Sequence, residues 1–356
     1  MQKLQVGLTR LLLLCLFSNI KTLARRGSTP RLVTTMKGYK NIVGILLAAG
    51  LLAGCSHDAE PTMQQEIAVT SGVTGMQKRI RSINNNTQLQ AKDIKIDAYY
   101  ADTETKLLDG VKLHYNTDEW VFWNGSAQVH YYWPFEGSKT GSGDDASTLD
   151  FVGFCPYDAP AYITGSDYDA EDGASFTCDI SSYMTHTAQA DMQEYVMAVL
   201  PDQTYAIQAA APGGALPMVF KHPFALVKFV LASGSGTHVT VDSIAIAGLY
   251  TGGTCTYDGT TMSWAGTGSA SLVINGLSLH TEGTTETVQM MVIPDDNYGD
   301  KTLFVRGTWD DWSDVANHTI SADVNMNWQP GYSYTYNLTV SKYALTVDGT
   351  QFTEQW

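Results

Sequence analysis

Short segments in which apolar and polar residues alternate are the feature that most constrains how this chain can fold. The alternation marks residues 93–100, 238–250, 287–294, 301–309 and 332–347, and stretches rich in Gly, Asn and Asp separate them. Successive side chains of a strand point to opposite faces, so this pattern predicts strands with one buried face. Many short strands with turns about every eight to twelve residues predict an all-β chain of antiparallel sandwiches.

Two stretches interrupt the β pattern. Residues 181–200 are the best helical candidate, and we expect helix only at their centre. Residues 208–217 are small, uncharged and rich in Gly and Pro, which is typical of a joint. We therefore expect two β-sandwich domains in tandem, residues 55–215 and 216–356. A loop inside one large sandwich is the alternative.

The chain begins with a signal-like region, residues 1–54, which we expect to be removed. The apolar run at 46–54 is too short to span a bilayer and fits the apolar core of a secretory signal. It ends in Leu-Ala-Gly-Cys55, which resembles the lipobox of bacterial lipoproteins. The resemblance implies cleavage before Cys55 and acylation of its sulfur, whereas an ordinary signal peptide is the alternative. A second apolar run precedes Met36, so translation starts at Met36 or the chain carries two signal segments.

Charge excludes one class of partner. Cleavage before Cys55 would remove eight of the 21 Lys and Arg residues and none of the 36 Asp and Glu residues. The remaining chain is strongly acidic, so it repels nucleic acid and anionic lipid. We expect no nucleic-acid partner.

Three cysteines remain once Cys15 and Cys55 are set aside: Cys155, Cys178 and Cys255. An odd number allows at most one internal disulfide, and Cys155 with Cys178 is the pair expected to share a domain. Two buried free thiols are the alternative. Cysteine and histidine spacings typical of metal sites are absent, and we expect no metal or cofactor.

Catalytic motifs are also absent from the sequence. It contains no HExxH, no GxSxG and no phosphate-binding glycine loop. His222 lies inside an apolar run, which favours a hydrogen-bonded structural role over that of a base. The acidic stretch 166–173 departs from the EF-hand pattern at its sixth and twelfth positions, so a solvated loop is favoured over a calcium site. We therefore expect a protein that is not an enzyme.

Three islands together resemble the fimbrillin family, the pilins and accessory pilins of Bacteroidia. The first, residues 129–160, contains Trp-Pro, a polar loop, Leu-Asp-Phe and Cys-Pro-Tyr. The second is the apolar run 216–231, and the third is the stretch WQPGYSYTYNLTV at 328–340, followed by a terminal strand. The resemblance implies two transthyretin-like antiparallel β-sandwiches in tandem and an exported lipoprotein on the outer membrane that becomes part of a fimbrium.

The family also assembles by exchange of strands, which the resemblance extends to this chain. A protease that cuts after Arg removes an early strand, and a strand of another subunit fills the vacated groove. Residues 65–73 match the early strand, and Arg79 and Arg81 lie in the following loop. A solvated basic turn is the alternative for that loop. The donor-strand candidates at the other end are Tyr343, Leu345, Val347, Phe352 and Trp356, and self-completion is the alternative for them.

The sequence thus predicts a structural or adhesive subunit, in a stalk, tip or anchor position, that binds other pilin subunits and a surface glycan or protein. A surface glycan-binding lipoprotein is the alternative. Trp120, Trp123, Trp309 and Trp312 are the candidates for stacking on sugars, although most aromatics in sandwiches are core residues.

Overall fold

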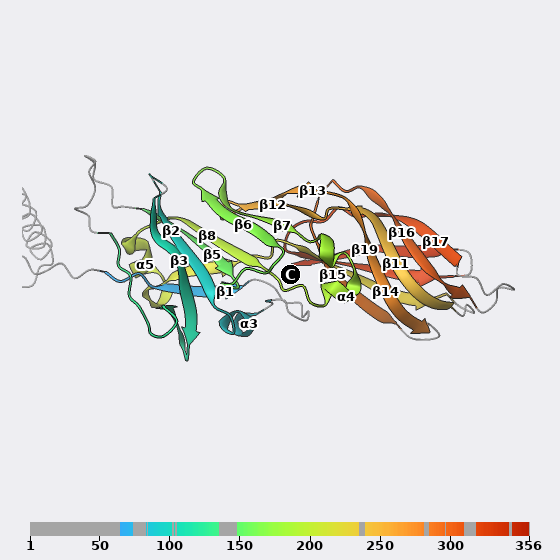
Figure 1. Ribbon diagram of the computed structural model, residues 1–356, viewed down its shortest axis with the longest axis horizontal. Helices are drawn as coiled ribbons and strands as arrows, with labels where there is room; N and C mark the ends of the chain where they lie inside the picture. Colours follow the sequence, from blue (N-terminus) through green and yellow to red (C-terminus); the bar gives the residue numbers. More distant parts are fainter. Residues whose placement is uncertain are drawn as a thin grey trace, which may run out of the picture. The chain divides into compact units, whose positions relative to one another are not determined.

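The computed structural model describes residues 65–73, 83, 85–101, 103, 105–134, 148–234, 239–280, 285–295, 297–309, 318–341 and 344–355, and side chains are not described at 276, 278–280, 286 and 349–355. Strands dominate this part of the chain, which confirms the predicted all-β class (Figure 1). Within it, every helix is too short or too polar to span a bilayer.

The strands of the first half are β1 (Val69–Val73), β2 (Ile94–Tyr100), β3 (Lys106–Asn116), β4 (Glu119–Trp123), β5 (Leu149–Cys155), β6 (Ile163–Asp169), β7 (Gly173–Asp179) and β8 (Val196–Gln203). Those of the second half are β9 (Leu216–Phe220), β10 (Ala225–Ser233), β11 (Val239–Leu249), β12 (Gly252–Tyr257), β13 (Met262–Thr267), β14 (Ala270–His280), β15 (Glu286–Val292), β16 (Asp300–Trp309), β17 (His318–Asn325), β18 (Tyr332–Val340) and β19 (Leu345–Gln355).

The helices are short: α3 (Asn86–Gln90), α4 (His186–Gln189) and α5 (Tyr205–Ala210), with single 3-10 turns at Ser181–Tyr183 and Pro212–Gly214. Each α-helix begins after a residue whose side chain accepts a backbone N–H of the first turn: Asn85, Thr185 and Thr204. The helix expected near the centre of 181–200 is therefore present, as α4.

A five-stranded antiparallel sheet, in the order β4-β3-β2-β5-β8, forms the first half of the fold. One of its faces packs on β1 and β9 in a single apolar cluster. Strand β5 is buried along its whole length because both of its faces are covered. Its sequence, LDFVGFC, accordingly shows little alternation, and its charged residue, Asp150, is buried as well.

Two four-stranded sheets, β15-β10-β18-β19 and β14-β11-β16-β17, form the second half. Side chains of both sheets join one buried cluster, so they pack as a sandwich. Most pairs are antiparallel, as the sequence predicts. The pairs β10–β18 and β1–β9 are parallel, which local alternation does not reveal.

A further four-stranded sheet, β13-β12-β7-β6, joins two hairpins that are distant in the sequence. Its central pair, β7 and β12, runs from Gly252↔Asp179 to Tyr257↔Ala174. Backbone pairing therefore crosses the predicted boundary at 215/216, as it also does between β1 and β9. The division into domains 55–215 and 216–356 stays a prediction.

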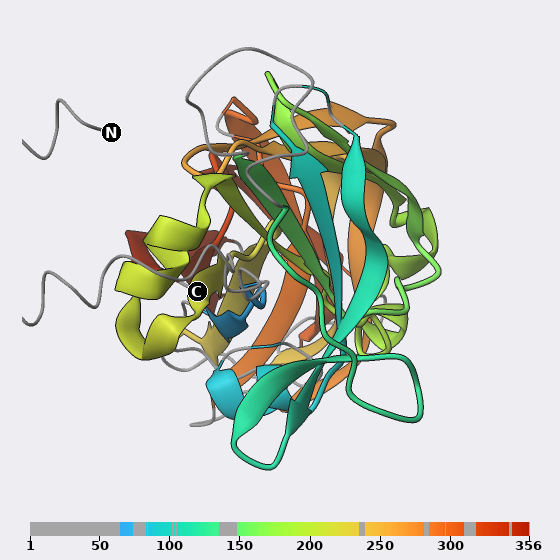
Figure 2. The same cartoon turned by 90° about the vertical axis from the view of Figure 1, so that its left-hand side faces the viewer.

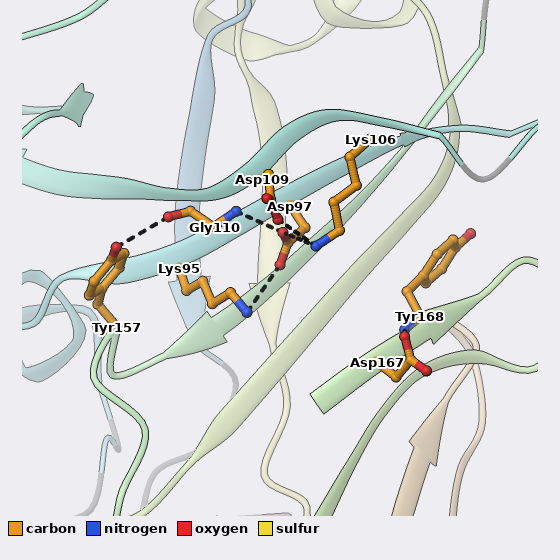
Figure 3. A network of polar contacts seen from close by, with 8 residues as sticks. All are labelled: Lys95, Asp97, Lys106, Asp109, Gly110, Tyr157, Asp167 and Tyr168. Atoms are coloured by element: carbon orange, nitrogen blue, oxygen red, sulfur yellow. Dashed lines mark hydrogen bonds and ion pairs between the residues drawn. The ribbon is translucent and has the colours of Figure 1, made fainter. Parts of the chain in front are cut away.

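A polar network occupies an irregular point of the β2–β3 pair, where the register shifts between Ile96 and Ala98 (Figure 3). Gly110 has a φ of 58° there, a conformation that glycine adopts without strain. Its N–H donates to the Asp97 carboxylate at 2.7 Å, and Lys106 Nζ lies 3.1 Å from the same oxygen. Burial would lower the pKa of Lys106, but hydrogen bonds to Asp109 and Asp97 raise it above its usual value. The network thus fixes the bulge.

Candidate functional site: the groove of the first strand

The first strand lies between two backbone segments that are far from it in the sequence. On one edge, Ile67 N–H donates to Tyr131 O and Trp133 N–H donates to Gln65 O, both at 2.8 Å. Beyond Ala68, the pairing continues on β9 in parallel register, from Val69↔Leu216 to Val73↔Phe220. Residues 65–73 therefore fill a groove between these segments, and the strand expected at 65–73 is present as β1 over Val69–Val73, preceded by an isolated bridge at Glu66.

The side chains of this strand alternate between the groove and solvent. Ile67 and Val69 are buried in the cluster that also contains Leu216, Met218 and Phe220 of β9, whereas Glu66 and Thr70 are exposed. Burying two such side chains stabilises the seated strand by roughly 3–6 kcal/mol before ordering costs. The seated segment thus buries apolar side chains two positions apart.

A buried glutamine contacts the main chain of the same segment. The amide oxygen of Gln208, on α5, accepts the Ala68 N–H at 3.1 Å, and its amide nitrogen donates to Glu66 O at 2.8 Å. Figure 2 shows β1, in blue, near the yellow-green helix α5. Gln208 thereby hydrogen-bonds residues 66 and 68, which precede the part of the segment that pairs with β9.

The chain is anchored again just after the first strand. Ile83 is buried, and its N–H donates to Glu194 Oε2 at 3.1 Å. Glu194 Oε1 lies 2.6 Å from His222 Nδ1, and both side chains are fully buried. The structural role predicted for His222 is confirmed. Arg79 and Arg81 fall between Val73 and Ile83, outside the described residues.

The terminal strand lies at a sheet edge. Strand β19 pairs with β18 of the same chain, from Tyr332↔Gln355 to Val340↔Leu345. Leu345 is buried and Val347 packs partly against the core. The register shifts between Thr335 and Asn337, opposite residues 348–352. Tyr343, Trp356 and the Phe352 side chain lie outside what is described, as does Cys55.

Buried carboxylates of the described residues serve structure. Asp97, Asp150 and Glu194 each accept a backbone N–H, from Gly110, Asp202 and Ile83 respectively. Such bonds compensate the cost of burying the charge. In the acidic stretch 166–173, the Asp169 carboxylate accepts N–H groups of the following turn, from Glu171 and Asp172.

The prediction that Trp309 could stack on a sugar is wrong. Trp309 is 1% exposed, and its indole N–H donates to Ser341 O. Trp120 and Trp123 are half-buried, Trp120 beside Tyr115 and Trp123 beside His114, and Trp312 lies outside the described residues.

The sequence did not predict a cavity of about 570 Å³, whose lining includes Trp264, Asp295, Gln329 and Tyr332. Its lining comes from four separate segments, so no local motif marks it.

Cys155, Cys178 and Cys255 are free and buried, which favours the free-thiol alternative over the disulfide. Burial raises the pKa of Cys178 to about 12 and that of Cys155 still further. The nucleophilic thiolate is therefore scarce at neutral pH.

In a chain that starts at residue 56, we expect no thiol to react with iodoacetamide at pH 8 until denaturant is added, as read by intact mass. Labelling of the native chain would contradict this.

Asp93 predicts how stability responds to acid. Burial would raise its pKa, but hydrogen bonds from Lys112 and His114, at 2.8 and 2.7 Å, outweigh burial and lower it. A carboxyl with a lowered pKa stabilises the fold above its unfolded value of 3.8, and this contribution is lost as the pH falls through the folded pKa. We expect Asp93→Asn to lose less unfolding free energy than the wild type between pH 7 and 3 in urea titrations. An equal loss in both would contradict the assignment.

The model of the family described as fimbrillin-like matches residues 81–356. Crystal structures of candidate cell adhesion proteins are similar in fold. One from Bacteroides uniformis has a TM-score of 0.50 and 17% identity, and covers 82% of this chain and 99% of its own. One from Bacteroides ovatus has a TM-score of 0.50 and 14% identity, and covers 82% and 98%.

A search of curated proteins finds no match. The family match covers most of the chain and bears out the resemblance noted in the sequence. The chain belongs to the fimbrillin-like family, whose members are structural and adhesive proteins of cell-surface fimbriae and not enzymes.

Proposed function

We propose that this chain is a fimbrial subunit that joins its neighbours by strand exchange. Cleavage after Arg79 or Arg81 would release residues 65–73, and the terminal strand of a second subunit would fill the groove. The position of the subunit is a stalk, a tip or an anchor. A tip subunit would also bind a glycan or protein on another surface.

The seating of the first strand is the observation that carries this proposal. Residues 65–73 are held by backbone bonds and by Ile67 and Val69, while the next described anchor is Ile83. A cut between Val73 and Ile83 would leave this segment attached by non-covalent contacts alone. Its loss would uncover apolar residues of β9, which favours refilling by another strand.

The terminal strand supports the proposal as donor. It has apolar residues two positions apart, Leu345 and Val347, like Ile67 and Val69 in the groove. In the order of described strands, β19 has β18 as its neighbour on one side and is an edge on the other. Release of β19 would therefore break the hydrogen bonds of one strand pair, β18–β19.

A lipid anchor fits the same scheme. Acylation of Cys55 would hold the precursor at the outer membrane, because two or three acyl chains suffice for stable anchoring. A cut after Arg79 or Arg81 separates Cys55 from the folded part. Stalk and tip subunits would lose the lipid on cleavage, whereas an anchor subunit would keep it.

The test is intact mass and amino-terminal sequencing of the protein from its native cell surface with an Arg-specific protease active. A terminus at Ile80 or Ser82 in polymerised material supports the proposal. An acylated Cys55 terminus in polymerised chains supports the anchor position. A chain that stays whole and monomeric contradicts strand exchange.

A glycan-binding role is the second candidate, and the 570 Å³ cavity favours it. Its lining combines Trp264 and Tyr332 with the polar Gln329 and Asp295, and its volume is in the range of small-molecule sites. Retention of soluble polysaccharide by the intact chain, reduced at least tenfold by Trp264→Ala and Tyr332→Ala, would support it. Retention unchanged by both variants would contradict this cavity as the site.

A further inference from the structure

Helix α5 reverses the usual arrangement of a surface helix, which turns its apolar residues toward the core. Its polar Gln208 is 4% exposed and accepts the indole N–H of the buried Trp133 at 2.9 Å. Tyr205 and Ile207, in contrast, are 40% and 45% exposed. Residues 204–220 also contain no Asp, Glu, Lys or Arg, although these residue types make up 16% of the chain. Exposed aromatic and apolar residues without charges are typical of the centre of a protein interface.

Exposed apolar side chains gather around the groove of the first strand. Among the described residues, the large apolar side chains that are exposed are Tyr132, Tyr205, Ile207, Val219 and Phe304. Tyr132 forms a bridge with the exposed Glu66, and Val219 pairs with Gly72. Helix α5 is joined to the same segment by the bonds of Gln208 to residues 66 and 68. All but Phe304 therefore border the groove. Single exposed apolar residues are common, but such a cluster marks an interaction site.

The length of the chain before the terminal strand indicates what covers this cluster. Strand β18 ends at Val340 and β19 begins at Leu345, so only residues 341–344 lie between them. This connection spans at most roughly 18 Å when fully extended. A terminal strand seated in the groove of another copy would therefore hold the body of its own subunit close to one end of that groove.

Most of the cluster lies at the end of the groove that holds residues 66–68, where Tyr132 and α5 are found, while Val219 lies beside Gly72. Strand β1 runs parallel to β9, and a donor strand that keeps this direction begins at the α5 end. The body of the donor then lies on α5. Residues 56–64 are the other candidate to cover α5, but they include Asp58 and Glu60, and a cut after residue 73 removes them together with the first strand.

We propose that the face of α5 with Tyr205 and Ile207 is a docking surface for the body of a second copy of this chain, the copy whose terminal strand fills the adjacent groove. This inference rests on the proposed strand exchange and extends it, because the groove takes the strand and α5 takes the subunit that donates it. Apolar burial on α5 adds to the burial of the strand. The second contact also restrains rotation of the two subunits about the short connection between them.

The test uses the full mature chain with the recognition sequence of a specific protease placed between Val73 and Ile83. The cut chain is immobilised at low density as the acceptor. Two analytes are compared, the uncut wild-type chain and a peptide of residues 345–356, and both must displace the same seated segment. The peptide fills the groove alone, whereas the chain also brings the body of a subunit. Biolayer interferometry gives the two affinities.

The acceptor variant Tyr205→Gln/Ile207→Gln is expected to bind the whole chain at least about tenfold more weakly, because two apolar side chains lose their buried contact. Its affinity for the peptide should change by less than about twofold, since both side chains are exposed rather than buried in the groove. Phe304→Gln is the matched control. Phe304 is 36% exposed on β16, away from the groove, so this variant should leave both affinities unchanged.

The outcomes separate the inference from the function on which it rests. If the uncut chain does not enter the cut wild-type chain, strand exchange fails and the inference with it. If Tyr205→Gln/Ile207→Gln binds the whole chain normally, or loses chain and peptide equally, the inference is overturned while strand exchange stands. A loss in Val219→Thr alone would overturn it by placing the donor at the other end of the groove. Loss of binding to phosphatidylcholine vesicles, with normal association of chains, would overturn it by assigning α5 to a membrane.

Discussion

Replacing His222 with leucine is expected to lower the free energy of unfolding by about 3–5 kcal/mol, as is usual when one partner of a buried pair is removed. His222 Nδ1 lies 2.6 Å from Glu194 Oε1, and neither side chain is exposed. The variant leaves the Glu194 carboxyl buried and bonded to the Ile83 N–H. Urea denaturation at pH 7, with the slope unchanged, measures the effect.

The double variant Glu194→Leu/His222→Leu distinguishes lost charge compensation from lost packing. It removes the buried charge, so most of the stability should return. It also leaves the Ile83 N–H without the Glu194 acceptor, and a deficit of about 1–3 kcal/mol should remain.

His130→Leu is the matched control. His130 Nδ1 is also 2.6 Å from a carboxylate, Glu66 Oε1, but the two side chains are 47% and 48% exposed. Exposed pairs contribute roughly 0–1 kcal/mol, so this variant should be nearly neutral. A loss in His222→Leu no larger than that in His130→Leu would contradict the assigned role of the buried pair.

Deleting residues 345–356 is expected to abolish fimbrial assembly, because the deletion removes the proposed donor strand. The truncated chain keeps the groove of residues 65–73, so it should still accept a donor. Added to wild-type chains after cleavage, it should shorten the fimbriae in proportion to its fraction, as measured by electron microscopy and size-exclusion chromatography.

If the truncated chain fails to fold, the variant Leu345→Asp/Val347→Asp tests the donor role in a chain of full length. It keeps the length of β19 and places charges where the apolar side chains would enter a neighbour's groove. Thr346→Asp is its control, since Thr346 is exposed on the same strand. Normal assembly of the double variant, or an equal loss in the control, would contradict the role of Leu345 and Val347.

Much of the fold could be predicted from the sequence because its signals are local. Alternation predicted β2, β11, β16 and β18, and the short helix α4 lies within residues 181–200, the best helical candidate of the sequence. Strand β5 and the parallel pair β10–β18 were not predicted, since a strand buried on both faces shows little alternation and the direction of pairing depends on the connections.

The candidate site divides in the same way. The first strand, the basic residues after it and the apolar spacing of the terminal strand can be identified in the sequence. Gln208, Trp133 and Glu194 could not, because the side-chain hydrogen bonds that tie them to this segment and to one another join residues 75 to 142 positions apart. The one signal that was available, a glutamine among small residues before the Gly-Pro stretch, is equally typical of a joint.

By itself, the sequence determined the β class, the acidic charge, the family resemblance and the positions of the alternating strands, because alternation, charge and motifs are properties of neighbouring residues. Tertiary structure alone decided that β7 pairs with β12, that β1 lies parallel to β9, that the three cysteines are free and that Trp309 is core. These depend on which segments meet, and that is set by the shared burial of apolar faces and the satisfaction of backbone hydrogen bonds across the whole chain.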